Sequence, residues 1–260
     1  MQRLVAALCA VLLLAGCGTT GGASPSVVPS NGAASVVASP SALQPTPGPS
    51  GGSGYCPNPE GAELNTCLGW LTGGTFYTST FKLPLTYTVP AGWGNLEDLP
   101  GNFLLLPVDG TLIGVNNSTS DYLGVYTSVA AAGHCDGQAS TMVAHSWQGL
   151  VDWLTSDPAL SVTNLKAVTV SGLGGDVMDI AMKDPKGDGC PDPQVFADVY
   201  VGINDSSLVH AVGPNYALRI YLLKHGADTV AIEIADAPHG YYADWPATAD
   251  GVIATFQFTP

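Results

Sequence analysis

The sequence predicts an α+β fold, in which an antiparallel β-sheet carries two or more packed helices, with a β-sandwich as the alternative. Short runs rich in β-branched and aromatic residues recur from position 76 onward, as expected for strands. Two segments show the apolar spacing of an amphipathic helix. The connections between the β-rich runs are short, which favours antiparallel neighbours over a doubly wound arrangement.

The expected strands share alternating or continuous apolar residues and are bounded by turn-forming residues. They are residues 76–83, 85–89, 103–107, 111–115, 122–129, 165–170, 177–182, 195–201, 216–223 and 229–235. The last two flank residues 224–228, which contain Gly226. A glycine-containing loop between two β-rich runs is typical of a hairpin, so this pair is the clearest one in the chain.

Two helices complete the predicted fold. The first follows Ser146, a preferred N-cap residue, stops near Asp157-Pro158, and has an apolar face made by Trp147, Leu150, Val151 and Leu154. The second begins near Pro246, a residue suited to a first helical turn, and its apolar face consists of Trp245, Ala249, Val252, Ile253 and Phe256. Residues 256–258 are then expected to form a last strand.

The first residues have the features of an export signal. Arg3 supplies a positive charge, residues 4–15 form an apolar run too short to span a bilayer, and Leu14-Ala15-Gly16-Cys17 follows. This tetrapeptide resembles the lipobox of bacterial lipoproteins. The resemblance implies cleavage of residues 1–16, attachment of diacylglycerol to the Cys17 thiol, modification with palmitate, and a lipid-anchored protein on the outer face of the cell membrane. An ordinary secretory signal, with Cys17 incidental, is the alternative.

The rest of the chain divides by composition. Residues 17–54, beginning with the lipidated Cys17, contain no charged and no aromatic residue, so we expect a disordered tether with an r.m.s. span of about 33 Å. Residues 55–260 are expected to form a single globular domain. The chain has 7 basic and 21 acidic residues and a formal net charge of −14, which makes nucleic acid an unsuitable partner.

Four cysteines remain in the expected domain, and the expected compartment is oxidising, so disulfides are predicted. Three connectivities are possible for Cys56, Cys67, Cys135 and Cys190. We favour Cys56 with Cys67, which closes a small loop, and Cys135 with Cys190. A metal site using His134, Cys135 and Cys190 is the competing interpretation, but this spacing matches no zinc template.

Residues 85–93, Leu-Thr-Tyr-Thr-Val-Pro-Ala-Gly-Trp, resemble the strand, proline, glycine and tryptophan opening of PsbP-like domains and of many uncharacterised exported bacterial domains. The late hairpin, terminal helix and short last strand are similar too. This resemblance implies an antiparallel sheet flanked by helices. It also implies a role in docking onto proteins or binding small ions, and it assigns no catalytic residue.

No motif gathers reactive residues, so the domain is predicted not to be an enzyme and to need no cofactor. Ser146 lacks the setting of a nucleophile and is better explained as a helix cap. Glu97 and Asp98 are adjacent, so their side chains should point apart rather than act together on a glycoside. Turn and surface positions are expected for the histidines, His134, His145, His210, His225 and His239.

Aromatic residues suggest two possible surfaces. Tyr241, Tyr242 and Trp245 could line one, although Trp245 also fits the core face of its helix. A groove could also form in the N-terminal third, around Trp70, Tyr77, Tyr87 and Trp93.

The loop at 184–192 faintly resembles a calcium loop, with Asp184, Asp188 and Asp192 as candidate ligands. Lys186 stands at a ligand position, and the closing glutamate of the EF-hand pattern is missing. The predicted function is therefore a membrane-anchored, extracytoplasmic, non-catalytic domain that binds an envelope protein, a wall component or a small ligand. The alternatives are a cell-envelope hydrolase and a calcium-stabilised module.

Overall fold

The computed structural model describes residues 68–107, 121–133, 137–184, 196–204, 208–214, 216–236 and 244–259. Several predictions fall outside these ranges. They concern the signal and tether, the strand at 111–115, the aromatic residues Tyr241 and Tyr242, the calcium candidates Asp188 and Asp192, and the cysteines Cys17, Cys56, Cys67, Cys135 and Cys190.

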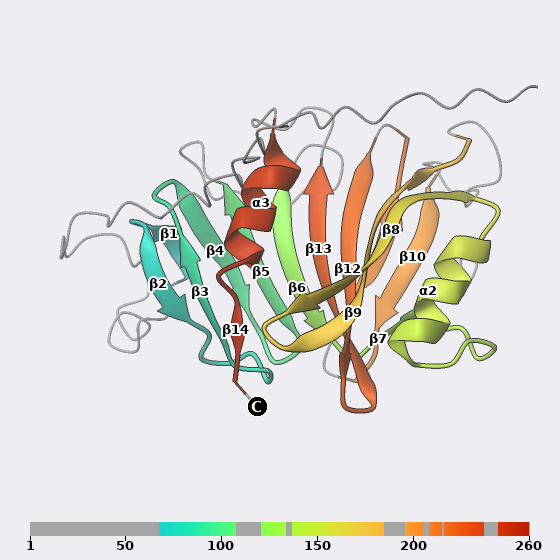
Figure 1. Ribbon diagram of the computed structural model, residues 1–260, viewed down its shortest axis with the longest axis horizontal. Helices are drawn as coiled ribbons and strands as arrows, with labels where there is room; N and C mark the ends of the chain where they lie inside the picture. The colour runs from blue at the N-terminus through green and yellow to red at the C-terminus, as the bar shows by residue number, and fades with distance from the viewer. Residues whose placement is uncertain are drawn as a thin grey trace, which may run out of the picture. The chain divides into compact units, whose positions relative to one another are not determined.

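The central layer is an antiparallel sheet of eight described strands in the order β1-β4-β5-β6-β13-β12-β9-β8 (Figure 1). These strands are β1 (Gly69–Leu71), β4 (Trp93–Asp98), β5 (Asn102–Pro107), β6 (Tyr122–Thr127), β8 (Leu160–Val170), β9 (Leu173–Met182), β12 (Ala217–His225) and β13 (Asp228–Asp236). The predicted hairpin is confirmed as β12 and β13. Its turn is tighter than expected, because only Gly226, with φ of +62°, and Ala227 separate the strands.

Each face of the central sheet is covered by one described helix and one three-stranded sheet. One cover consists of α2 (Trp147–Ser156) with β7 (Val129–Ala131), β10 (Ala197–Gly202) and β11 (Val209–Val212). The other consists of α3 (Trp245–Ile253) with β2 (Gly74–Tyr77), β3 (Leu85–Val89) and β14 (Gln257–Phe258). Figure 1 shows α2 and α3 at well-separated positions along the sheet.

This layering explains why the central strands are nearly continuous apolar runs. In β13, Ile232 and Ile234 enter the core on the α3 side, whereas Ala231 and Ala235 enter the core on the α2 side. A strand with two buried faces cannot alternate between apolar and polar residues. At about 25 cal/mol per Å² of apolar surface, burial on both faces is the main stabilising contribution.

Both predicted helices are present. The Ser146 hydroxyl caps α2 by accepting a hydrogen bond from the Gly149 amide at 3.2 Å, as predicted, and Leu150, Val151 and Leu154 are buried. Pro246 stands in the first turn of α3. Trp245 is fully buried and lies 5.1 Å from Trp93, between ring centroids, so its predicted core role is confirmed. Neither described helix has the length and apolarity needed to cross a membrane.

The architecture therefore agrees with an antiparallel α+β fold in which strands dominate. Four strands, β1, β4, β7 and β11, were not predicted, since the predicted strand at 122–129 corresponds to β6 and reaches only the first residue of β7. In β4 the cause is composition, since Gly94, Asn95 and Asp98 are types depleted in strands.

The predicted strand at 76–83 stops at Tyr77. The Asp98 carboxylate accepts hydrogen bonds from the backbone amides of Ser79, Thr80 and Phe81, at 2.7 to 3.1 Å, and holds these residues in a loop.

Candidate functional site

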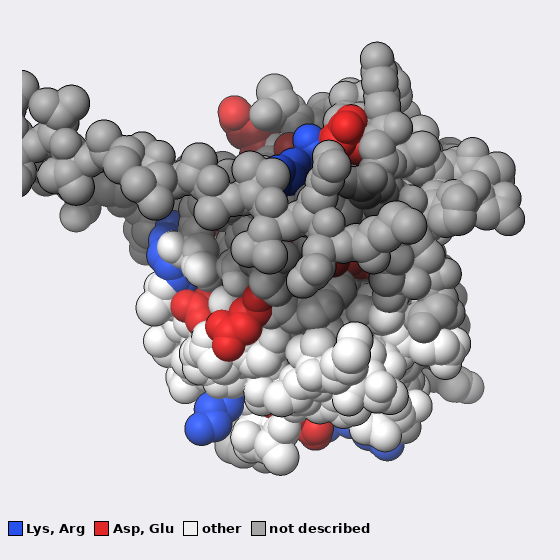
Figure 2. All heavy atoms as spheres, turned by 90° about the vertical axis from the view of Figure 1, so that its right-hand side faces the viewer, with Lys and Arg blue, Asp and Glu red and all other residues white. Residues whose placement is uncertain are grey.

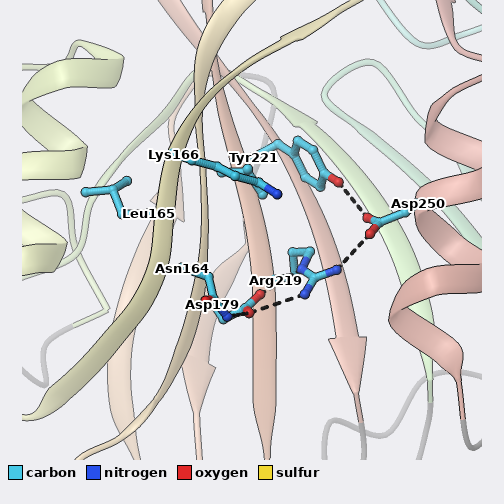
Figure 3. A pocket seen from close by; sticks show the side chains of 8 residues that line it. Asn164, Leu165, Lys166, Asp179, Arg219, Tyr221 and Asp250 are labelled. Carbon is cyan, nitrogen blue, oxygen red and sulfur yellow. Dashed lines mark hydrogen bonds and ion pairs between the residues drawn. The ribbon is translucent and has the colours of Figure 1, made fainter. Parts of the chain in front are cut away.

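A hollow of about 440 Å³ lies on the α3 side of the central sheet, between the β8–β9 hairpin and α3 (Figure 3). Its volume is within the range of small-molecule sites, about 300–1,000 Å³. We call it the groove. It is lined by Asn164, Leu165, Lys166, Val177, Asp179, Arg219, Tyr221 and Asp250.

Arg219, on β12, organises the groove. Its Nε and Nη2 donate to the two carboxylate oxygens of Asp179, at 2.7 and 3.2 Å, and its Nη1 donates to Asp250 at 2.7 Å. Asp179 lies opposite Arg219 in the β9–β12 register, whereas Asp250 comes from α3. One guanidinium can bind two carboxylates at once because its N–H donors point outward in a rigid plane. These contacts raise the pKa of Arg219, first through the hydrogen bond with Asp179.

The carboxyl group of Asp179 is held in its charged form. Partial burial alone would raise its pKa, but hydrogen bonds from Arg219 and Asn164 outweigh burial and keep the pKa below its usual value. Lys166 adds a smaller effect in the same direction.

Tyr221 connects the sheet to α3 from the same side. Its hydroxyl donates to the second Asp250 oxygen at 2.5 Å. Burial, followed by this hydrogen bond, raises the pKa of Tyr221. Both oxygens of Asp250 therefore receive donors from β12, and Figure 3 shows them turned toward Arg219 and Tyr221.

Asn164 reaches the groove because β8 is irregular. The register with β9 shifts between Thr163 and Lys166, and Asn164 has a φ of +54°. Asparagine tolerates this left-handed conformation better than most residues, and such a bulge can redirect a side chain. The Asn164 amide donates to Asp179 at 2.7 Å. The bulge also leaves Leu165 46% exposed.

Lys166 is the groove's remaining cation. It lies opposite Val177, and Figure 3 shows its side chain extending toward the side where Tyr221 and Asp250 lie. Within the described part of the chain its ammonium group makes no ion pair. Three hydrogen-bond donors are thus available to a ligand.

The groove continues along β8 into a second hollow of about 220 Å³. Tyr221 and Asp250 border both hollows. The other lining residues are more apolar, namely Val168, Thr169, Val170, Ser171, Ile253 and Ala254. The combined site therefore has a polar end and an apolar end.

A second polar cluster is fully enclosed. The Glu233 side chain has no exposed surface, and its carboxylate accepts hydrogen bonds from the Tyr122 hydroxyl and, at 2.5 Å, from the Tyr200 hydroxyl. His210 Nδ1 lies 3.1 Å from it. Since Glu233 and Tyr122 belong to the central sheet and the other two to the β7–β10–β11 sheet, this cluster joins two layers.

The environment of Glu233 favours its charged form. Burial would raise its pKa, but the His210 charge and the hydrogen bonds from its neighbours together lower it. The pKa of Tyr200 is raised, first by burial and then by the nearby carboxylate. His210 was expected at a turn or surface, and this was wrong. It is 7% exposed and packs against the rings of Tyr126 and Tyr200, with centroid distances of 4.4 and 4.5 Å.

The other sequence candidates are not brought together. Asp98 accepts hydrogen bonds from the loop at 79–81. Glu97 is half-buried, and burial raises its pKa although the nearby His210 acts in the opposite direction. Tyr87 and Trp93 are buried, so they line no surface groove. Asp184 is exposed, and among the described residues no group of three or more His, Cys, Asp or Glu side chains could hold a metal ion.

The groove residues were missed from sequence. They come from four elements, and no local spacing connects them. One signal was available, because Arg219 is an isolated charge within an otherwise apolar run at 217–223. Elsewhere charge is sparse. On the face shown in Figure 2, red and blue side chains are scattered over a mostly white described surface, in keeping with a charged fraction of 11%.

Comparison with known proteins identifies no family and only weak structural resemblances. No family of known proteins matches the sequence, and no curated protein resembles it. A crystal structure of a Bacteroides thetaiotaomicron protein is 12% identical, with 73% of this chain covered and a TM-score of 0.34, and the chain spans about half (50%) of that protein. The solution structure of cyanobacterial PsbP from Synechocystis is 12% identical, covering 76% of this chain and 99% of the other, with a TM-score of 0.36. Both are weak resemblances of fold.

Proposed function

We propose that the chain is an extracytoplasmic lipoprotein, anchored to the cell membrane through Cys17, whose domain binds a ligand in the groove and catalyses no reaction. The lipobox at residues 14–17 supports the anchor. The tether composition of residues 18–54 supports a domain that stands away from the membrane.

The preorganised network around Arg219 supports the binding role most directly. Exposed ion pairs usually contribute little to stability, about 0–1 kcal/mol each. A non-glycine residue in the left-handed region costs free energy, although asparagine costs less there than most residues. The chain nevertheless keeps Asn164 in that conformation and aims its amide at Asp179. Such strain is concentrated at ligand sites in proteins, where it fixes the geometry before the ligand arrives.

The same network supports the absence of catalysis. A general acid needs a raised pKa, as in the carboxyl pairs of glycoside hydrolases. Here Arg219 lies between two groove carboxylates, and the pKa of Asp179 is lowered. The two carboxylates are suited to hold an arginine in place, and the lowered pKa makes Asp179 poorly suited to donate a proton.

Lysine footprinting on intact cells tests this proposal. Cells carrying the full-length chain, and the same chain purified in detergent, are treated with an amine-reactive reagent and compared by mass spectrometry. We expect Lys166 to react several-fold more slowly on cells, because a ligand covers the groove. Lys224, exposed on the β12–β13 hairpin, is the matched control and should react at the same rate in both samples.

Equal labelling of Lys166 on cells and in detergent would contradict a groove ligand. Equal slowing of both lysines would contradict it too, since general crowding would then account for the result.

A further inference from the structure

We infer that the groove takes a neutral, hydroxyl-rich ligand, a carbohydrate. This rests on the proposed function, because it names the class of ligand for the same site.

The charge balance of the lining favours a neutral ligand. Asp179 and Asp250 are matched by Arg219 and Lys166, so the groove has no net formal charge. The chain as a whole carries −14, which disfavours an approaching anion. A cationic ligand would have to compete with the Arg219 guanidinium, which already lies 2.7 Å from both carboxylates.

The remaining hydrogen-bonding capacity favours hydroxyl groups. The Lys166 ammonium offers donors, whereas the carboxylates of Asp179 and Asp250 keep lone pairs beyond those used by Arg219, Asn164 and Tyr221. A hydroxyl both donates and accepts, so neighbouring hydroxyls on one ring can satisfy an ammonium and a carboxylate together. A ligand with only donors would leave the Lys166 ammonium without a partner, and one with only acceptors would leave the carboxylate lone pairs without one. Either is costly in a partly desolvated site.

The second hollow extends this match. Val168, Ile253 and Ala254 give it an apolar wall, with Thr169 and Ser171 beside them. A sugar presents C–H groups on its ring faces, and an acetylated sugar also presents a methyl group. An oligosaccharide that spans both hollows would therefore place hydroxyls near Lys166 and the two carboxylates and an apolar face against β8 and α3.

A glycan array followed by titration tests the inference. The full-length chain in detergent is applied to neutral, anionic and cationic oligosaccharides, and the dissociation constant of each retained glycan is measured. We expect only neutral glycans to be retained. Asn164→Gly keeps the left-handed backbone without strain and removes the amide that holds the Asp179 carboxylate in place, so affinity should fall by up to about tenfold as that carboxylate loses its fixed position. Lys166→Gln should weaken binding similarly, and Lys224→Gln is the control.

Three outcomes overturn the inference. Retention of charged glycans alone would contradict the neutral ligand. Affinity unchanged by both Asn164→Gly and Lys166→Gln would place the sugar elsewhere. No retained glycan, with Lys166 still protected on cells, would remove the carbohydrate and leave the groove to another ligand, such as an extended peptide paired with the edge strand β8. If Lys166 is also unprotected, the proposed function fails as well.

Discussion

The Arg219 guanidinium lies 2.7 Å from an Asp250 carboxylate oxygen, and this contact ties the last helix of the chain to the central sheet. The other Asp250 oxygen accepts the Tyr221 hydroxyl, so two neighbouring residues on one face of β12 hold the same side chain of α3. The groove is complete only when α3 is docked, because Asp250 forms part of its wall. The contacts of Asp250 with Arg219 and Tyr221 in turn help to hold α3 on the sheet.

Replacing Arg219 should loosen this attachment. Arg219→Met keeps the apolar stem but removes both ion pairs. Because the three side chains are 26 to 34% exposed, each pair contributes under about 1 kcal/mol, and we expect a total loss of about 1 kcal/mol. Urea unfolding measures the change, and Arg219→Lys, which can keep one pair, should lose less. An unchanged midpoint for Arg219→Met would show that the network does not stabilise α3.

Acid should destabilise the enclosed cluster. Because the folded state lowers the pKa of Glu233, its contribution is complete above the unfolded value, about 4.3, and is lost as pH falls through the lower folded value. Tyr200→Phe removes one hydrogen bond to the carboxylate, so the folded pKa should rise and the acid transition should move to higher pH. The unfolding free energy between about pH 2 and 6 measures this shift.

Tyr77→Phe is the control for that measurement, since the Tyr77 side chain is on the surface, with 36% exposure. It should leave the acid transition in place. If Tyr200→Phe also leaves it in place, acid unfolding is governed by other carboxyl groups.

Local chemistry accounts for the parts of the fold that the sequence predicts well. Ser146 caps α2, Pro246 begins α3, and Gly226 makes the hairpin turn, and each acts on residues close to it in the chain. The strand β4 was missed because its glycine, asparagine and aspartate are poor strand formers. Pairing with β1 and β5 on both sides determines its conformation.

The candidate site could not be predicted in the same way. Asn164, Asp179, Arg219 and Asp250 are distant in sequence, and only the pairing of β8, β9 and β12 and the docking of α3 bring them together. The error for His210 has the same cause. Its partner Glu233 belongs to a different sheet, so a lone histidine in the sequence gave no indication of burial.

The lipid anchor makes a separate prediction. Cells fed radiolabelled palmitate should label the wild-type chain, because the thiol of Cys17 is expected to take up diacylglycerol, which carries the acyl chains. Cys17→Ser should abolish the label and release the protein from the membrane fraction. Cys9→Ser, within the expected signal, is the matched control and should keep both. A labelled Cys17→Ser chain would show that acylation occurs at another residue.

Packing at Gly124 makes a sharp prediction about the core beside Glu233. A Cβ added at Gly124 would lie 2.2 Å from the Tyr126 hydroxyl oxygen and 2.5 Å from two ring carbons, and Tyr126 is itself only 2% exposed. The ring cannot move away without disturbing His210, so Gly124→Ala should lower the free energy of unfolding by about 1–3 kcal/mol, the usual cost of overpacking. Gly174→Ala, on β9, is the control because its added Cβ would meet nothing within 4 Å. It should be neutral or slightly stabilising. Equal stability of the two variants in urea would mean that the Tyr126 ring has room to shift, and that the enclosed cluster is less tightly packed than its distances indicate.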